Sequence, residues 1–328
     1  MVKKERNTIL TIAFLLLAVA PLIFSNNYHR FVLCNILINV ILVMALNFIL
    51  GFAGQVFLGT VGFFAIGSYV TALLTTRLGF TFWQAVPWSI VVTSCFSLVL
   101  GLPTLKLSGF YLALMSHGFI VVTVDVLKNW TSITNGVWGI ANIPRPVVFG
   151  HSFGKDIEFY YLAFMVTAAL AFLAVIIEDS RFGRAFKVVR DDELAGEVIG
   201  INPISSKLLA FVISGAYVGI AGALYASFQR FISPDIFSAQ YNSLLMCMLV
   251  IGGLGSVPGS VVGATLMTTL TEMLRFMRER YLTVYAIIII VTLVYQPTGL
   301  MGALSSIYHW LKLRFSKTAL AARGGNIQ

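Results

Sequence analysis

Residues 180–222 read SRFGRAFKVVRDDELAGEVIGINPISSKLLAFVISGAYVGIAG, a charged segment that runs directly into a long apolar stretch. Apolar residues recur at helical spacing in its first third, so we expect a short amphipathic helix with one apolar face. These residues are Phe182, Ala185, Phe186 and Val189. An acidic run, residues 191–193, follows and indicates the start of a second helix.

Asp191 or Asp192 can cap that second helix, where acidic residues also suit the positive end of the helix dipole. Four small or apolar residues would lie mostly along one side of it: Leu194, Ala195, Val198 and Ile199. Gly200 suits a left-handed stop, and after Pro203 the side chain of Ser205 can cap the next helix. These features predict a helical elbow with an apolar knob, which suits the docking of a soluble partner. A solvated loop between two membrane helices is the alternative.

The composition places the chain among polytopic membrane proteins. Of its 328 residues, 58% are hydrophobic and 11% are charged, and the mean hydropathy is +0.90, unlike a soluble domain. The net charge of +9 comes from basic residues in loops that flank apolar segments, so it indicates orientation in a bilayer rather than nucleic-acid binding. Residues 1–24 lack a small-residue cleavage motif, and we interpret them as a retained first span. The three cysteines lie in apolar stretches without disulfide or zinc spacing and are expected to be packing residues.

Ten apolar segments have roughly the length of a membrane span, two of them being short. They lie at about 8–24, 31–50, 57–76, 83–102, 107–127, 158–177, 206–228, 241–251, 259–274 and 282–295. A polar stretch, residues 128–157, separates five segments from five, and an odd number per half inverts one half relative to the other. We therefore expect an all-α polytopic membrane protein of about ten transmembrane segments in two inverted five-span halves, forming one domain over residues 1–328.

Three basic residues near the N-terminus favour a cytoplasmic start. Ten spans then place the elbow, about residues 178–205, and the C-terminal tail, residues 303–328, in the cytoplasm. The polar stretch at 128–157 would lie outside. The distribution of Lys and Arg favours this orientation only modestly, and the cluster Arg275–Arg280 does not fit it.

Glycines punctuate one stretch in each half. They are Gly51, Gly54, Gly59, Gly62 and Gly67 in the first, and Gly252, Gly253, Gly255, Gly259 and Gly263 in the second. Small residues let membrane helices approach closely. The alternative is that the helices are short or broken near the midplane, with freed backbone groups lining a cavity. The short segment at 241–251, followed by Pro258, favours a break in the second stretch.

Five motifs, placed in order around the elbow, resemble those of the LivM-type permeases of branched-chain amino acid ABC importers. The first is Gly54-Gln55-Val56-Phe57-Leu58-Gly59 followed by FFAIGSY at 63–69, similar to GQxSLGHAAFFGIGAY, with Phe57 and Thr60 in place of the usual serine and histidine. The second is Gly109, Tyr111, Ala113, Ser116 and Phe119, for GxYFAxxTLAF. The third is Asn129-Trp130, Thr134-Asn135-Gly136 and Gly139-Ile140, for NW…TGGxxGL, with Asn135 at a usual glycine. The last two are Gly252–Ser256 and Pro297–Leu300.

The elbow itself matches through Glu193-Leu194-Ala195, Gly200-Ile201-Asn202 and the segment 207–226. The match runs from about residue 35 to residue 302 and is specific to the family, but not to its substrate.

In that family the elbow is a coupling loop that docks into a groove on a separate ATPase subunit. The resemblance assigns to it Arg190, Asp192, Glu193, Ala195, Gly200 and Ile201. It also implies a second permease subunit, two ATP-binding subunits, a periplasmic substrate-binding protein, and a multi-pass location in the bacterial inner membrane with lipid around it. We expect no nucleic-acid partner, no enzyme activity and no cofactor, because the sequence shows no catalytic constellation, metal-ligand spacing or P-loop, so ATP would be bound by the partner subunits.

The expected substrates are branched-chain or other apolar amino acids. A urea or short-amide importer is the nearest alternative, and a secondary transporter or channel that works alone is a rival of a different class. We expect the substrate path between the two halves, at Gln55, Gly59, Gly62, Tyr111, Ser116, Thr134, Asn135 and Gly136. The alternative is that these residues only satisfy contacts between helices. His117 and Asp125 share a helix face, where they could line a path or relay protons, or His117 could bond a neighbouring helix.

Overall fold

The computed structural model describes residues 3–23, 26–105, 107, 109–148 and 151–274, and the single positions 286, 287, 290, 299 and 302. The predicted span at 282–295, the cluster Arg275–Arg280 and the tail at 303–328 therefore lie outside the described residues, apart from those single positions.

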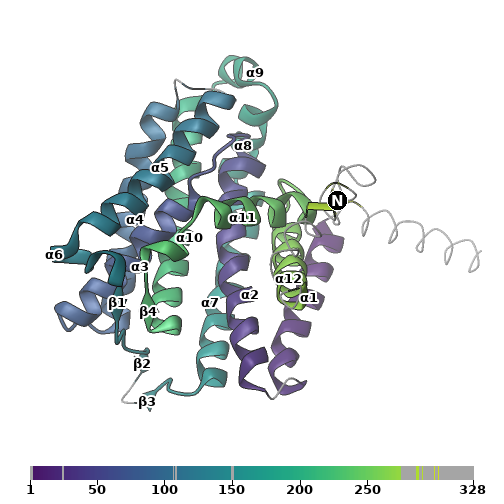
Figure 1. The fold of residues 1–328 in the computed structure, drawn as a ribbon. Coiled ribbons are helices and arrows are strands. Elements are labelled where there is room, and N and C mark those ends of the chain that lie inside the picture. Colours follow the sequence, from purple (N-terminus) through teal and green to yellow (C-terminus); the bar gives the residue numbers. More distant parts are fainter. Residues whose placement is uncertain are drawn as a thin grey trace, which may run out of the picture.

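The elements up to residue 134 are α1 (Lys3–Ile23), α2 (Asn27–Leu46), η1 (Asn47–Phe52), α3 (Thr60–Arg77), α4 (Phe82–Thr104), α5 (Phe110–Asn129) and α6 (Thr131–Thr134). Next come η2 (Gly136–Trp138), β1 (Ile140–Ala141), β2 (Val147–Val148), β3 (His151–Ser152), α7 (Asp156–Asp179), α8 (Arg181–Asp191) and α9 (Glu193–Val198). The last are α10 (Pro203–Gln229), β4 (Phe231–Ile232), η3 (Pro234–Ile236), α11 (Ala239–Gly252) and α12 (Val257–Leu274). Figure 1 shows the arrangement of these elements.

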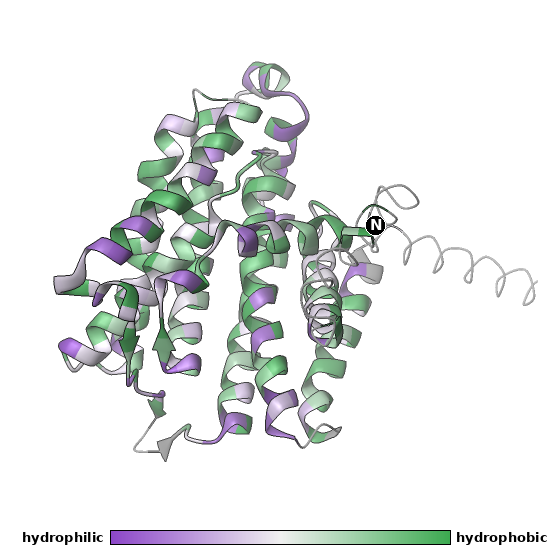
Figure 2. Cartoon of the chain, in the orientation of Figure 1, coloured by the Kyte–Doolittle hydropathy of each residue, from purple (hydrophilic) through white to green (hydrophobic). Residues whose placement is uncertain are grey.

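Each predicted apolar segment before residue 275 corresponds to one helix of the set α1–α5, α7 and α10–α12. Six helical segments among the described residues are long and apolar enough to cross a membrane. Apolar residues cover most of their length (Figure 2). The expectation of a helical, polytopic membrane protein is confirmed at this level.

The polar stretch at 128–157 contains short strands that the sequence did not predict. β1 pairs with β4 in an antiparallel ladder, with Ile140 opposite Ile232. β2 and β3 form a small hairpin, with Val147 opposite Ser152. The first ladder joins the chain that follows α5 to the chain that follows α10, so the two helices end on the same side of the bundle.

The long helices run between two ends of the molecule, whereas α11 lies across the bundle (Figure 1). At the end that holds α8 and α9, called the elbow end here, Arg6 of α1 donates to Asp179 at the end of α7. At the opposite end, called the loop end, Lys128 of α5 pairs with Asp235 of η3 at 2.7 Å. The start of α1 and the elbow therefore lie on the same side, as the predicted orientation requires.

Helix α2 forms the centre of the core. All its residues from Ile36 to Leu46, and the first three of η1, are buried. It packs against α7, α10, α11 and α12. Because a membrane helix enclosed by other helices needs no polar face, the buried part of α2 is apolar on every side except at Asn39, which donates to Thr268.

Helix α10 packs against α3 and α4 at backbone distance. A Cβ at Gly219 would overlap Thr93 Oγ1, and a Cβ at Gly222 would lie 2.7 Å from Ser68 N. The hydroxyl of Ser89 donates to Gly219 O at 2.9 Å. Small residues allow this approach, and side-chain hydroxyls then bond backbone across the interface. Close packing through small residues therefore holds along α10. It also holds within the two stretches first singled out, where a Cβ at Gly67 would lie 3.2 Å from Gly219 Cα and one at Gly263 would overlap Met248 O.

Gly219→Val should destabilise the chain, because the added methyl groups have no space between α10 and α4. Overpacking of this kind typically costs about 1–3 kcal/mol. The matched control is Gly118→Ala on α5, where an added Cβ meets nothing within 4 Å. Thermal unfolding in detergent should show a midpoint several degrees lower for Gly219→Val and an unchanged midpoint for the control. Equal unfolding midpoints for the two variants would contradict the close packing of α10 against α4.

Candidate functional site

The turn between α7 and α8 is tight and capped. The hydroxyl of Ser180 accepts from Phe182 N at 3.1 Å and from Gly183 N at 3.4 Å. A Cβ at Gly183 would overlap Glu178 O, so only glycine fits there. This cap sets the direction in which α8 leaves the membrane helix.

The apolar face predicted for α8 is confirmed in part. Phe186 and Val189 are buried at 1% and 2% exposure, and they pack the helix onto the bundle. Phe182 is 43% exposed and lies beneath the Arg181 guanidinium, 5.0 Å from it. The expectation that Phe182 shares the buried face is wrong, because the Ser180 cap places it on the outer side of the first turn.

Helix α9 begins and ends as the sequence predicts. Asp192 is the cap: its Oδ1 accepts from Leu194 N at 2.9 Å and from Ala195 N at 3.1 Å. At the other end Gly200 has φ +82°. Ile201 N donates to Gly196 O there, while Gly200 N donates to the carbonyl of residue 197. These two bonds make the Schellman arrangement that favours glycine at this position.

The prediction that Ser205 caps α10 is wrong. The cap is Asn202, whose side-chain oxygen accepts from Ser205 N at 3.2 Å. Pro203 occupies the first turn of α10, where its fixed φ suits a helix and its missing N–H removes no bond. Lys207, one turn further, is buried and pairs with Glu193 Oε1 at 2.5 Å, which ties the start of α9 to α10.

Helix α9 carries an exposed apolar patch, called the knob here. Its members and their exposed fractions are Leu194 75%, Val198 87%, Ile199 66% and, at the start of α10, Ile204 54%. Ala195 is also exposed. A shallow cavity of about 350 Å³, lined by Glu197 and residues 200–204, lies beside it. Helix α9, which carries most of the knob, projects beyond the ends of the other helices (Figure 1), and apolar patches of this kind mark interaction surfaces.

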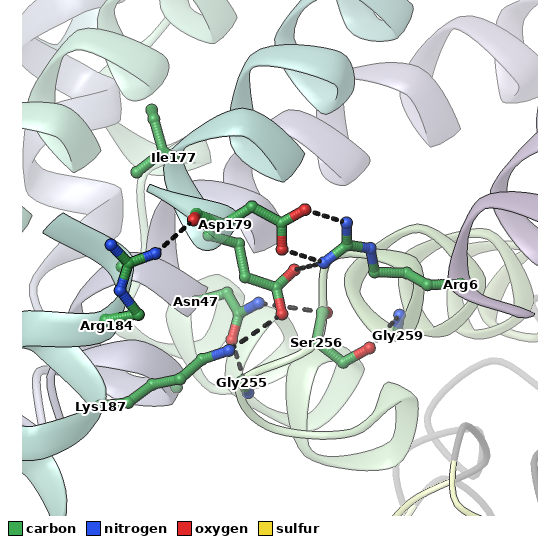
Figure 3. A network of polar contacts seen from close by, with 12 residues as sticks. Arg6, Asn47, Ile177, Asp179, Arg184, Lys187, Gly255, Ser256 and Gly259 are labelled. Atoms are coloured by element: carbon green, nitrogen blue, oxygen red, sulfur yellow. Dashed lines mark hydrogen bonds and ion pairs between the residues drawn. The ribbon is translucent and has the colours of Figure 1, made fainter. Parts of the chain in front are cut away.

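A cluster of ion pairs, called the clamp, holds the elbow to α1 and α7 (Figure 3). Arg6 donates to both carboxylate oxygens of Asp179, at 2.8 and 2.7 Å. Lys187 of α8 pairs with Glu178 at 3.1 Å, and Arg184 donates to Asp179 O at 2.9 Å. A bidentate Arg–carboxylate pair is the strongest geometry of its kind. The clamp therefore makes α8 and the end of α7 move together.

A second contact, called the junction, joins α8 to the end of η1. Arg190 Nη1 donates to Gly51 O at 3.0 Å, and its guanidinium also pairs with Asp191 at 2.9 Å. A Cβ at Gly54, which has φ +70°, would lie 2.5 Å from Arg190 Cγ. The arginine side chain thus lies directly on the glycine backbone that follows α2.

Asn47 extends the junction to the turn between α11 and α12. Gly255 N donates to Asn47 Oδ1 at 2.9 Å, and Asn47 Nδ2 donates to Ser256 O at 3.1 Å (Figure 3). A Cβ at Gly51 would overlap Asn47 Oδ1 and lie 2.5 Å from Gly255 N. The two glycine stretches of the sequence therefore meet here, beside the elbow.

The break predicted for the helices is confirmed at both stretches. After the π-helical turn η1 the chain is non-helical over residues 53–59, and it is again non-helical between α11 and α12. Buried side chains satisfy the freed backbone: Ser116 Oγ accepts from Leu58 N at 2.9 Å, and Asn242 Oδ1 accepts from Val61 N at 3.2 Å. Irregular backbone inside a membrane requires such partners.

Three polar atoms at this break have no hydrogen-bond partner in the described part of the chain. They are Gln55 Oε1, Thr60 Oγ1 and Asn242 Nδ2, all in buried residues. Thr60 opens α3, and Asn242 lies in the first turn of α11. The bond from Val61 N to Asn242 brings the starts of these two helices together.

The predicted path residues fall into separate places. Gln55, Gly59 and Gly62 belong to the break and the start of α3, and Ser116 joins them from α5. Tyr111 lies on the outer side of α5, 69% exposed. The remaining residues, Thr134, Asn135 and Gly136, lie at the loop end.

The loop-end residues use their polar groups locally. Thr134 Oγ1 donates to Leu127 O at 2.6 Å and accepts from Gly136 N at 3.3 Å. Asn135 has φ +65° and donates to Gly139 O at 3.1 Å. These bonds close the turn after α5. A role in the path stays a prediction for them, as it does for the other residues.

Sequence reasoning did not single out Asn47 or Asn242. Both are amides inside apolar segments and are 1% exposed, and a polar side chain in a span was the available signal. In the sequence, Thr60 stood out only as a departure from a family motif. The clamp residue Arg6 was counted only as a charge that orients the N-terminus.

Arg190→Ala should loosen the backbone of residues 47–59, because Gly51 O loses its donor and Gly54 loses the side chain packed on it. Loss of a partly buried hydrogen bond to a charged group costs about 1–3 kcal/mol. Arg181→Ala is the control, since Arg181 is exposed and its guanidinium lies over the Phe182 ring at the surface. Hydrogen exchange in peptides covering 47–59 should accelerate in Arg190→Ala and stay unchanged in the control. Unchanged exchange in both variants would refute the junction.

Residues 30–294 match the family described as the permease component of branched-chain amino acid transport systems. The high-affinity branched-chain amino acid transport system permease LivM of Salmonella typhimurium is 32% identical over 288 residues, which cover 81% of this chain and 68% of that protein. LivM of Escherichia coli is 31% identical over 314 residues, 88% of this chain and 74% of that protein. LivH of Escherichia coli, a permease of the same description, is 33% identical over 189 residues, 54% of this chain and 60% of that protein. No solved structure matches the chain.

These relatives are transport permeases rather than enzymes, and they confirm the resemblance drawn from the motifs and the elbow. The apolar helices and the family together establish a multi-pass membrane protein. The chain belongs to the family of permease components of branched-chain amino acid transport systems.

Proposed function

We propose that this chain is one of two permease subunits of an ATP-driven importer for branched-chain or other apolar amino acids in the bacterial inner membrane. Escherichia coli has two permeases, LivM and LivH, both named for high-affinity branched-chain amino acid transport, and this chain is similar to both. That pairing supports a second, different permease as the partner. Two ATP-binding subunits and a periplasmic binding protein complete the proposed assembly.

The observation that carries this proposal is the knob on α9. Leu194, Val198 and Ile199 are exposed at the tip of a charged elbow, where a membrane protein that works alone has no use for them. The clamp holds the elbow in place, so it presents the knob as a rigid surface. A groove on an ATP-binding subunit would cover the apolar side chains, and the small Ala195 allows close approach. The elbow end and both termini would then be cytoplasmic.

The junction offers a route from the ATP-binding subunits to the membrane interior. Arg190 bonds Gly51 O, and Asn47 bonds the Gly255 turn. A displacement of the elbow therefore reaches both breaks, at the end of η1 and at the turn after α11. ATP hydrolysis on the partner would act on this chain through that contact.

We propose that the start of α3 and the start of α11 together form the site where polar groups of the substrate bind along the path. Thr60 Oγ1 and Asn242 Nδ2 are buried there without partners in the described part of the chain, and Gln55 Oε1 is likewise buried without a partner in the non-helical segment before α3. Two helix N-termini with free hydroxyl and amide groups suit the carboxylate of an amino acid. Neutral urea and short amides lack that anionic group, so this feature favours amino acids over the alternative substrates.

Two inverted halves are supported by the direction of the broken helices. After α2 the chain turns back at the elbow end, and α3 runs toward the loop end. After α10 the chain turns back at the opposite, loop end, and α11 crosses the bundle to the turn at Gly255, which meets the junction. We propose about ten spans on this plan, with the remaining span after residue 274.

Ala195→Arg should abolish docking of the ATP-binding subunit. It places a long charged side chain where the knob must fit closely, and an unpaired buried charge costs about 3–5 kcal/mol, or at least about a hundredfold in affinity. Co-purification of the ATP-binding subunits and ATP-driven uptake of radiolabelled leucine should both be lost. Ala195→Ser, which keeps a small side chain, is the matched control and should retain both.

Normal assembly and uptake in Ala195→Arg would show that the knob is not the docking surface. Uptake by the chain alone, without ATP or partner subunits, would instead establish the stand-alone transporter.

A further inference from the structure

Helix α5 has two distinct faces and lies at one edge of the bundle (Figure 1). The buried residues recur at three- and four-residue spacing: Leu112, Ser116, Ile120, Thr123 and Leu127. The opposite side, called the outer face, is exposed at Phe110, Tyr111, Leu114, His117, Val121, Val122 and Asp125. The outer face has no neighbour among the described residues that would bury it.

The outer face carries ionisable groups at membrane depth. His117 lies near the middle of the 20-residue helix, and Asp125 lies two turns further along the same side. Both side chains are exposed. Ionisable side chains in a spanning helix are costly against lipid, and they face other helices or a water-filled cavity instead. The outer face of α5 is therefore not built for lipid.

Helix α4 shows the contrast within the same chain. Its exposed side chains include Trp88 at 54%, Val91 at 52%, Phe96 at 48% and Val99 at 65%, and α4 contains no Asp, Glu, Lys, Arg or His. Cys95 is exposed on this helix as well, so the expectation that it is a packing residue is wrong within this chain. The exposed face of α4 suits lipid, whereas that of α5 does not.

Gly118 gives the outer face a small-residue notch beside His117. An added Cβ there would meet nothing within 4 Å, so no contact inside the described chain requires a glycine. A small residue next to a polar one is the pattern that lets a second membrane helix approach and form hydrogen bonds. The notch points to a helix as the occupant.

We propose that the outer face of α5, centred on His117 and Gly118, packs against the second permease subunit. A soluble partner cannot reach the middle of a spanning helix, and lipid does not accommodate His117. A water-filled cavity at this edge of the bundle would still need a second protein as its far wall, so the occupant is another membrane protein. This inference rests on the proposed two-permease assembly. It also gives Tyr111, a predicted path residue exposed on the same helix, a place at the boundary between the two permeases.

Photo-crosslinking from position 118 tests the proposal. Gly118→Cys, in a Cys95→Ala background, is labelled with benzophenone maleimide in membranes that contain the whole transporter, and is then illuminated. The expected product is an adduct with the second permease, identified by mass spectrometry. The matched control is the native Cys95 on α4, labelled in the same way, which should give lipid adducts only.

Adducts of position 118 with lipid only, with another part of this chain, or with a second copy of it would overturn the proposal. Co-purified second permease and ATP-driven uptake are measured on the same preparation. If both are present while position 118 labels lipid, α5 does not contact the second permease, but the proposed two-permease importer is still supported. If no second permease is recovered, the proposed assembly fails together with it.

His117→Leu provides an independent measurement. It makes the outer face compatible with lipid, so recovery of the second permease should fall by about threefold, the effect of losing one typical polar contact between membrane helices. Val99→Leu on α4 should leave recovery unchanged. Equal recovery from both variants would contradict a role for His117 in this contact.

Discussion

The contact between Arg190 and the glycine backbone at Gly51 and Gly54 constrains the whole elbow end. The guanidinium bonds Gly51 O, and its stem lies against Gly54, which has a positive φ. The side chain of Asn47 then accepts a hydrogen bond from Gly255 N and donates one to Ser256 O, in the turn between α11 and α12. Larger side chains at these glycines would separate the three segments. The elbow, the end of α2 and the turn before α12 therefore form one unit.

That unit explains why the broken helices lie where they do. A break in a membrane helix is tolerated only if other groups bond its free backbone. Ser116 and Asn242 do this inside the membrane, while Arg190 and Asn47 do it at the elbow end. The same bonds connect the exposed knob of α9 to the paired starts of α3 and α11.

Local features were predictable from the sequence, and long-range ones were not. Asp192 and Gly200 use bonds to residues within five positions, so their roles as cap and stop followed from residue type. The cap of α10 was misassigned because Asn202 and Ser205 are both good caps on either side of Pro203. The β1–β4 ladder and the contacts of Asn47 and Asn242 join segments far apart in the chain, and no local pattern encodes them. The family resemblance identified the elbow, but only the structure shows that its knob is exposed and that its arginine reaches the break.

The account is tested most directly by the accessibility of the knob from each side of the membrane. Leu194→Cys and Trp138→Cys, each in a Cys95→Ala background, place thiols at two well exposed positions, one at the elbow end and one at the loop end. An impermeant maleimide should label position 194 only in inside-out vesicles, and added ATP-binding subunits should protect it. Position 138 should be labelled only from the opposite side and should not be protected by those subunits. Labelling of position 194 that is unaffected by the ATP-binding subunits, or that occurs from outside, would contradict the account.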